Sequence, residues 1–264
     1  MMREESTEFE ISKQVGEERH LVNDRVAGEE PLQITVDGTP VAVVMRTPGD
    51  DEDLVRGFLL TEGLVDSLDD VRHIDLEAKQ NHALVFLADD VLLDHESLSR
   101  NLYSASSCGI CGKASIEAIQ QHAPPIESDF SISVATVLAL PDALRAEQEV
   151  FANTGGLHAA ALFSGEGKLL VLCEDIGRHN AVDKVIGWAA GGGTDLTKTV
   201  LQVSGRVSFE VMQKALVARI PVVSAISAPS SLAVDFARES GQTLIGFLRP
   251  PKFNIYSGEE RIVS

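Results

Sequence analysis

Two thiols separated by two residues are the strongest chemical signal in this chain of 264 residues. The segment 104–113, with the sequence SASSCGICGK, surrounds Cys108 and Cys111 with small residues and glycines, which predicts an open, pliable loop. A helical pattern begins directly after this segment, so we expect the thiols to lie near a helix N-terminus. Unpaired N–H groups there, together with Lys113, favour the thiolate, which is the nucleophile in sulfur exchange. The segment therefore predicts a cysteine that accepts sulfur from a donor persulfide and passes it on.

The same cysteine pair is compatible with other uses. It could be half of a zinc site, but no second such pair or close pair of histidines completes one. Cys173 and His158 could in principle join it, although Cys173 lies in an apolar run typical of a core strand. A dithiol oxidoreductase is a further alternative, although the strand expected just before a thioredoxin motif is missing, and a purely structural role is another. The sequence predicts no metal ion bound by protein ligands.

Polar loops in the second part of the chain form the next group of candidates. Each follows a predicted strand and precedes a predicted helix; they are residues 173–180, 204–208 and 227–231. In a parallel sheet these loops would emerge at the carboxyl edge, where helix N-termini and the side chains of Arg178, His179 and Arg206 suit a nucleotide-like anion. The alternative is ordinary helix capping by Ser208 and Ser230, with the arginines in surface ion pairs.

Three further polar side chains adjoin these loops. Glu174 and Asp175 could act as acid/base groups, bind a guanine-like edge or cap a helix. His158 could be an acid/base group or a structural histidine. No phosphate-binding motif of the G-x-x-x-x-G-K-[ST] or G-x-G-x-x-G type is present.

Composition limits the class of protein. The formal net charge of −18 disfavours general nucleic-acid binding, because phosphates would be repelled. No apolar run approaches the roughly 18 residues that span a bilayer, and the polar, acidic N-terminus does not resemble a signal peptide. Three cysteines, an odd number, favour a reducing cytoplasm over a secreted disulfide framework.

The patterning predicts a flexible tail over residues 1–20, a small α+β domain over 21–100 and an α/β domain over 101–264 that carries the cysteine loop. In the small domain, a hairpin over 32–47 turns at Asp37-Gly38, a helix covers 50–60, and strands cover 71–77 and 82–87. In the larger domain, helices are predicted over 113–122, 141–151, 180–190, 208–219 and 230–240, and strands over 158–163, 169–173, 199–203, 222–226 and 243–248. Their alternation predicts a largely parallel sheet with helices on both faces.

Five segments together resemble the FdhD family of formate dehydrogenase accessory sulfurtransferases. They are 106–112 (SSCGICG), 154–158 (TGGLH), 174–184 (EDIGRHNAVDK), 204–206 (SGR) and 224–231 (SAISAPSS). The resemblance implies a sulfurtransferase that takes sulfur from a cysteine desulfurase as a persulfide on Cys108, with Cys111 as the second thiol. It implies transfer to the bis(molybdopterin guanine dinucleotide) molybdenum or tungsten cofactor, which the formate dehydrogenase catalytic subunit needs for activity.

The resemblance also implies a cofactor-binding stretch, a fold and an oligomeric state. The stretch corresponds to Phe247, Leu248, Arg249, Pro250, Pro251 and Lys252, although the family commonly has glycine where this chain has two prolines. The larger domain is expected to be a three-layer α/β/α sandwich resembling the cytidine deaminase fold, and the protein a homodimer. The chain lacks the deaminase pattern of H-x-E followed by P-C-x-x-C, so we expect the scaffold without that chemistry. A non-catalytic chaperone that holds the molybdenum cofactor during insertion is the alternative function.

Overall fold

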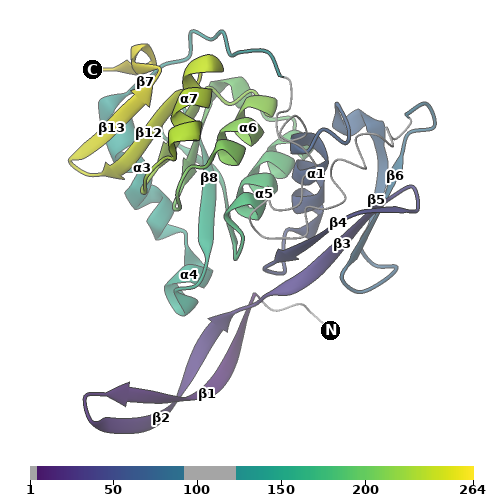
Figure 1. The fold of residues 1–264 in the computed structure, drawn as a ribbon, viewed down its shortest axis with the longest axis vertical. Helices are drawn as coiled ribbons and strands as arrows, with labels where there is room; N and C mark the ends of the chain where they lie inside the picture. The colour runs from purple at the N-terminus through teal and green to yellow at the C-terminus, as the bar shows by residue number, and fades with distance from the viewer. Residues whose placement is uncertain (1–4, 92–122) are drawn as a thin grey trace.

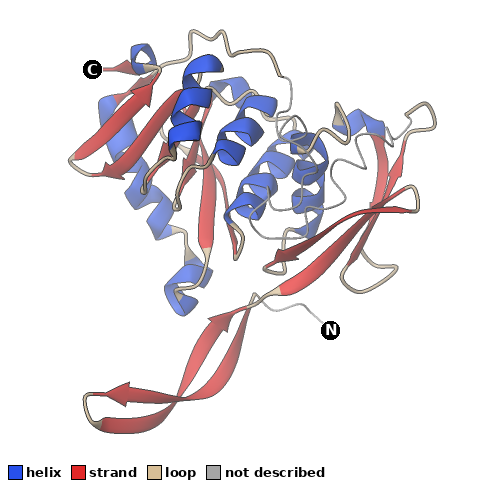
Figure 2. Cartoon of the chain, in the orientation of Figure 1, coloured by secondary structure: helices blue, strands red, loops and turns tan. Residues whose placement is uncertain are grey.

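The computed structural model describes residues 5–91 and 123–264, which form six α-helices and four β-sheets (Figures 1 and 2). Within these residues, no helix has the length and apolar character needed to cross a membrane. The helix predicted over 113–122 and the domain boundary predicted at residue 100 lie outside the described residues.

The N-terminal segment forms a long hairpin. Strands β1 (Ser6–Val15) and β2 (Glu18–Ala27) pair through ten antiparallel residue pairs and project from the rest of the molecule (Figure 1). This differs from the flexible tail expected over residues 1–20. Most of the hairpin side chains are exposed, so neither strand has the buried face that marks a half-buried strand.

The small unit is a four-stranded sheet with one helix. Its strands are β3 (Glu30–Val36), β4 (Thr39–Arg46), β5 (Val71–Asp75) and β6 (His82–Leu87), in the order β4-β3-β6-β5. Helix α1 (Asp51–Thr61) packs Leu54 and Leu59 against Leu32 and Ile34 of β3 in one apolar core. The predicted hairpin with its turn at Asp37-Gly38 and the predicted helix are confirmed.

The larger unit is built on a six-stranded mixed sheet. Its order is β13-β12-β11-β10-β8-β9, from β8 (His158–Ser164), β9 (Leu169–Asp175), β10 (Thr199–Val203), β11 (Val222–Ala225), β12 (Thr243–Arg249) and β13 (Lys252–Ser257). Only β10–β11 and β11–β12 pair in parallel, so the expectation of a largely parallel sheet is wrong. Strands β8 and β9 are joined by the short turn at residues 165–167, and parallel pairing would need a much longer crossover.

Helices lie against both faces of this sheet. Helix α3 (Val134–Ala146) packs against the face that carries Ala161 and Phe163 of β8. Helices α5 (Arg178–Gly191), α6 (Phe209–Val217) and α7 (Ser231–Glu239) pack against the opposite face, which carries Ala160 and Leu162. Alternate residues of one strand thus enter two cores, as a pleated strand requires. The likeness to the cytidine deaminase fold stays a prediction.

Two helices replace the single helix predicted over 141–151. Helix α3 begins at Val134, where the Ser133 hydroxyl accepts the N–H of Thr136, and it includes Pro141 in its interior. A separate short helix, α4 (Glu149–Thr154), follows after a break at Glu147 and Gln148. The remaining elements are β7 (Ile132–Ser133), β14 (Ile262–Val263) and the 3-10 helices η1 (Leu68–Asp70), η3 (Leu196–Lys198) and η4 (Glu259–Arg261).

The two units meet through the close approach of α1 and α5. A Cβ atom added at Gly57 of α1 would lie 1.9 Å from the carbonyl oxygen of Asp183, and one added at Gly187 of α5 would lie 1.9 Å from that of Asp53. Beside this contact, the buried ammonium of Lys214 donates to Asp183 at 3.0 Å and to Thr61 at 2.8 Å. The small unit is therefore tied to the larger one by backbone contact and by charge.

Candidate functional site

A cleft of about 710 Å³ lies at one edge of the six-stranded sheet. Strands β9, β10 and β11 all end at this edge, and β8 begins there, because His158 pairs with Asp175 and the N–H of Ser204 donates to the carbonyl of Ala159. The sequence prediction that these loops meet at one edge is therefore correct, although the sheet is mixed. Polar residues that line the cleft are Asp142, Arg145, Gln148, His158, Ser204, Arg206 and Ser227.

His158 lies at the centre of this arrangement. Gly205 approaches it so closely that an added Cβ would lie 3.2 Å from its Nδ1 atom. Partial burial, and then the positive charges of Arg178, His179 and Arg206, lower the pKa of His158 from its ordinary value. At neutral pH the cleft therefore presents an uncharged imidazole beside guanidinium groups, and its unprotonated ring nitrogen can accept a proton.

The two arginines predicted at this site are both near His158. Arg206 is exposed at the start of the β10–α6 loop and lines the cleft. Arg178 opens α5 and lies next to Gly205, and its buried Nε atom has no acceptor among the described residues. Neither guanidinium forms an ion pair with a described carboxylate, so both charges are available to an anion.

The predicted role of His179 as a ligand contact is not supported by its position. Its side chain is buried, and its Nε2 atom lies 3.0 Å from a carboxylate oxygen of Glu210 and 3.2 Å from the hydroxyl of Ser208, both near the start of α6. The histidine therefore joins α5 to α6.

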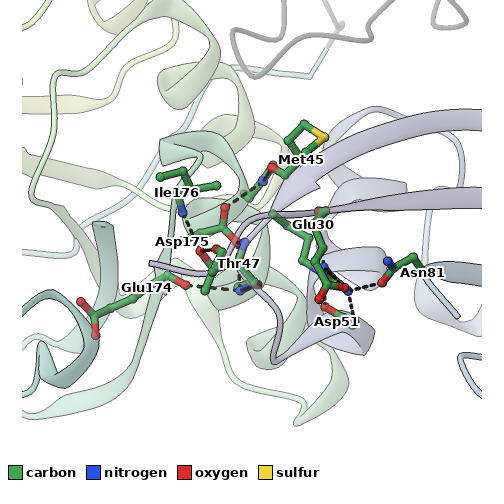
Figure 3. Close-up of polar contacts among 12 residues, drawn as sticks. Glu30, Met45, Thr47, Asp51, Asn81, Glu174, Asp175 and Ile176 are labelled. Atoms are coloured by element: carbon green, nitrogen blue, oxygen red, sulfur yellow. Dashed lines mark hydrogen bonds and ion pairs between the residues drawn. The ribbon is translucent and has the colours of Figure 1, made fainter. Parts of the chain in front are cut away.

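Asp175 holds the two units together. Its buried carboxylate accepts the N–H of Thr47 at 3.1 Å (Figure 3). It also accepts the N–H of Gly177 at 2.8 Å and the side-chain amide N–H of Asn180 at 2.9 Å. The ammonium of Lys184 lies 3.0 Å from the same carboxylate and donates to the carbonyl of Thr47. An acid/base or guanine-binding role for Asp175 is therefore wrong, because its oxygens are used within the protein.

Glu174 caps a helix that sequence reasoning did not connect with it. Its two carboxylate oxygens accept the N–H groups of Val150 and Phe151 at 2.8 and 2.9 Å, at the start of α4. Helix capping was one of the alternatives for this residue, but the capped helix is α4 and not the following α5. The contact fixes α4 as a wall of the cleft.

The predicted cofactor-binding stretch, residues 247–252, comprises the end of β12, the two-residue turn at Pro250-Pro251 and the first residue of β13. The N–H of Phe247 donates to the carbonyl of Ser227, a residue of the cleft, at 3.0 Å. Phe247, Arg249, Pro250, Pro251 and Lys252 are exposed, whereas Leu248 is fully buried in the core. The backbone of the stretch thus adjoins the cleft, and five of its six side chains are accessible.

The cysteines divide into two groups. Cys108 and Cys111 lie outside the described residues. Cys173 is buried in β9, and burial raises the pKa of its thiol to about 12, which supports the core role expected for it. Over residues 5–91 and 123–264, no group of three or more metal-ligating side chains is present.

Sequence reasoning missed the wall that α3 and α4 contribute. Arg145 and Gln148 line the cleft, and Arg145 also lies over the ring of Phe151 at 4.6 Å. The sequence of this region predicts an ordinary helix, and no motif in it indicates which side of the helix faces the sheet edge. Only the packing of α3 reveals it.

Comparisons with known proteins all point to one family. The model of the FdhD/NarQ family matches residues 27–263. The chain is 49% identical to the sulfur carrier protein FdhD of Streptomyces avermitilis, over 90% of this chain and 89% of that protein, and 44% identical to that of Sulfolobus acidocaldarius, over 96% of each. A crystal structure of a candidate formate dehydrogenase accessory protein from Desulfotalea psychrophila superposes with a TM-score of 0.81 at 24% identity, covering 98% of this chain and all of that one.

Proposed function

The chain belongs to the FdhD/NarQ family, and on this premise we propose that it is a sulfurtransferase that matures the active-site cofactor of formate dehydrogenase. Sulfur transfer in the service of formate dehydrogenase is the part of this proposal that the relatives support directly. The donor, the persulfide and the acceptor cofactor are our extension of it.

The proposed loading step uses Cys108. Its thiolate attacks the outer sulfur of a cysteine desulfurase persulfide, the sulfur–sulfur bond of the donor breaks, and the desulfurase leaves as a thiolate. Cys111 then attacks the sulfur atom of Cys108, which forms a disulfide and releases the terminal sulfur at the oxidation level of sulfide. The two thiols supply the two electrons, and a cellular thiol must reduce the disulfide before the next cycle.

The observation that carries the acceptor side is the cleft at the sheet edge. Arg178 and Arg206 have no carboxylate partner among the described residues, and both lie beside His158, whose pKa is lowered first by burial and then by these charges. Unpaired guanidinium groups at a strand-end edge suit phosphate groups. We propose that the bis(molybdopterin guanine dinucleotide) molybdenum or tungsten cofactor binds here as substrate, with Arg249 and Lys252 of the adjoining turn contacting its phosphates.

Sulfur loading is tested by mass spectrometry after incubation with a cysteine desulfurase and cysteine. We expect one added sulfur atom on Cys108, its loss in Cys108→Ala, and no activation of formate dehydrogenase by that variant. Activation by Cys108→Ala at the wild-type level would contradict the proposal. Cysteines without added sulfur, together with intact cofactor binding, would favour the alternative of a chaperone that only holds the cofactor. A metal ion bound at a stoichiometric amount would favour a zinc protein.

Cofactor binding is tested by calorimetry with guanine nucleotides, which are fragments of the cofactor. We expect affinity to fall as salt rises, because charged contacts are screened. The double change Arg249→Ala and Lys252→Ala should weaken binding and leave sulfur loading on Cys108 unchanged. Wild-type affinity in this double variant would assign binding to Arg178 and Arg206 alone.

A further inference from the structure

The ring of His158 opens onto the cleft without a fixed partner. It is partly buried, and neither of its nitrogens has a hydrogen-bond partner among the described residues. Gly205 lies directly beside it, since an added Cβ would lie 3.2 Å from Nδ1 of His158 and 4.0 Å from the Cβ of Arg178. Histidine is the side chain whose charge changes most readily near neutral pH. A ring in this position is therefore free to change its protonation state when a ligand enters the cleft.

The surroundings of this ring favour its neutral form. Partial burial lowers the pKa of His158 most. Arg178 and His179, at the start of α5, and Arg206, in the loop before α6, lower it further. Asp175 acts in the opposite direction with the smallest effect of these causes, and its carboxylate is already paired within the protein. A negative charge bound in the cleft would counteract the positive charges and so favour the protonated ring.

The α3 wall of the cleft leaves this balance of charge unchanged. It contributes one charge of each sign, from Asp142 and Arg145, and neither forms an ion pair with a described residue. The excess positive charge of the cleft therefore lies on the side of Arg178 and Arg206. An anion that enters the cleft is attracted to the side on which His158 lies.

We propose that His158 is the proton-accepting member of the anion site, and that its ring takes up one proton from the solvent when a phosphate diester binds beside Arg178 and Arg206. This inference rests on the proposed function, which places the phosphates of the cofactor in the cleft. The imidazolium then donates an N–H to a phosphate oxygen, and no covalent bond other than the new N–H bond is formed. Because binding and protonation favour each other equally, the site holds its ligand more tightly as pH falls and releases it more readily as pH rises.

Calorimetry in buffers of different ionisation enthalpy counts the protons that are taken up on binding. The probe is diguanosine diphosphate, two guanosines joined by a pyrophosphate diester, which lacks the terminal phosphate group that itself titrates at about pH 6. We expect proton uptake near neutral pH, and an affinity that rises about tenfold or more as pH falls through the range in which the ring titrates. His158→Gln should bind the probe without proton uptake and with little dependence on pH. His20→Gln, at an exposed position of β2, is the matched control and should behave as the wild type.

A second measurement follows the ring itself and does not need the nucleotide. Sulfate carries no proton in this range, so replacing chloride by sulfate at constant ionic strength should raise the pKa of His158, as followed by NMR, and leave that of His20 unchanged. Nucleotide binding without proton uptake, or uptake that persists in His158→Gln, would overturn the inference and leave the proposed cofactor site intact. If the nucleotide does not bind, the acceptor side of the proposed function fails instead. In that case an unchanged pKa of His158 in sulfate would overturn the inference as well.

Discussion

The carboxylate of Asp175, at the end of β9, accepts the backbone N–H of Thr47 at 3.1 Å across 128 positions of sequence. The hydroxyl of Thr47 in turn accepts the N–H of Ile176 at 3.1 Å (Figure 3). These reciprocal contacts anchor the small unit to the strand that borders the cleft. Asp175, which the sequence offers as a candidate acid/base group, therefore connects the two units.

Asp175→Asn should destabilise the protein strongly. The change leaves the buried ammonium of Lys184 without its carboxylate and turns an amide N–H towards the N–H of Thr47. Removing one partner of a buried ion pair typically costs about 3 to 5 kcal/mol. Urea unfolding measures the loss, and Asp195→Asn on the exposed surface should have a far smaller effect. Similar losses for the two variants would mean that the Asp175 network adds little to stability.

Gly57→Ala should force the two units apart. The added methyl group would lie 1.9 Å from the carbonyl oxygen of Asp183, a backbone atom that cannot turn aside. Overpacking of this kind costs about 1 to 3 kcal/mol, and more where the backbone must move. At Gly156 the added methyl comes no nearer than 3.4 Å to any other atom, that atom being the Cβ of Ala27, so Gly156→Ala is the control. Urea unfolding of both variants measures the difference. The same unfolding midpoint for Gly57→Ala as for Gly156→Ala would contradict the close approach of α1 and α5.

The pKa of His158 should lie below the ordinary histidine value of 6.5, mainly because the ring is partly buried and also because Arg178, His179 and Arg206 repel its proton. Arg206→Ala should move the pKa back towards 6.5, as followed by NMR titration of the ring. Arg145→Ala, at another wall of the cleft, is the control and should shift it less. No change in Arg206→Ala would remove that guanidinium from the surroundings of His158.

The same lowered pKa predicts how stability depends on pH. The unfolded chain takes up the proton of His158 at a higher pH than the folded chain, so this residue makes stability fall as pH drops below about 6.5. In His158→Gln this part of the slope should disappear, as measured by urea unfolding at a series of pH values. An identical slope in the variant would show that His158 does not contribute.

Cys173 should resist alkylation in the folded protein. Burial raises the pKa of its thiol to about 12, so almost none is thiolate at pH 8, and the sulfur is also shielded from the reagent. Mass spectrometry after treatment with iodoacetamide should find Cys173 unmodified in the native chain and modified in denaturant. Modification of Cys173 at the same rate in both conditions would contradict its burial in β9.

Much of the fold could be predicted from local pattern. Three short segments each specify their element through local interactions: the turn at Asp37-Gly38, the acidic residues before Leu54, and the segment 199–203, which is rich in β-branched residues. The same reasoning correctly predicted that the loops after β9, β10 and β11 share an edge. It failed at residues 6–20, where both strands are largely exposed. It also failed in the direction of β8, although the short turn at residues 165–167 requires β8 and β9 to run antiparallel.

The sequence by itself determined the residue types that can carry sulfur, the candidate anion-binding loops and the family to which the chain is similar. Only the tertiary structure decided which polar residues of the segment 174–184 remain available to a ligand. The guanidinium of Arg178 has no carboxylate partner among the described residues. In contrast, Asp175 accepts a hydrogen bond from Thr47, and His179 contacts Glu210. A side chain becomes a joint or a binding group according to the partners that distant parts of the chain bring to it, and one-dimensional spacing does not contain that information.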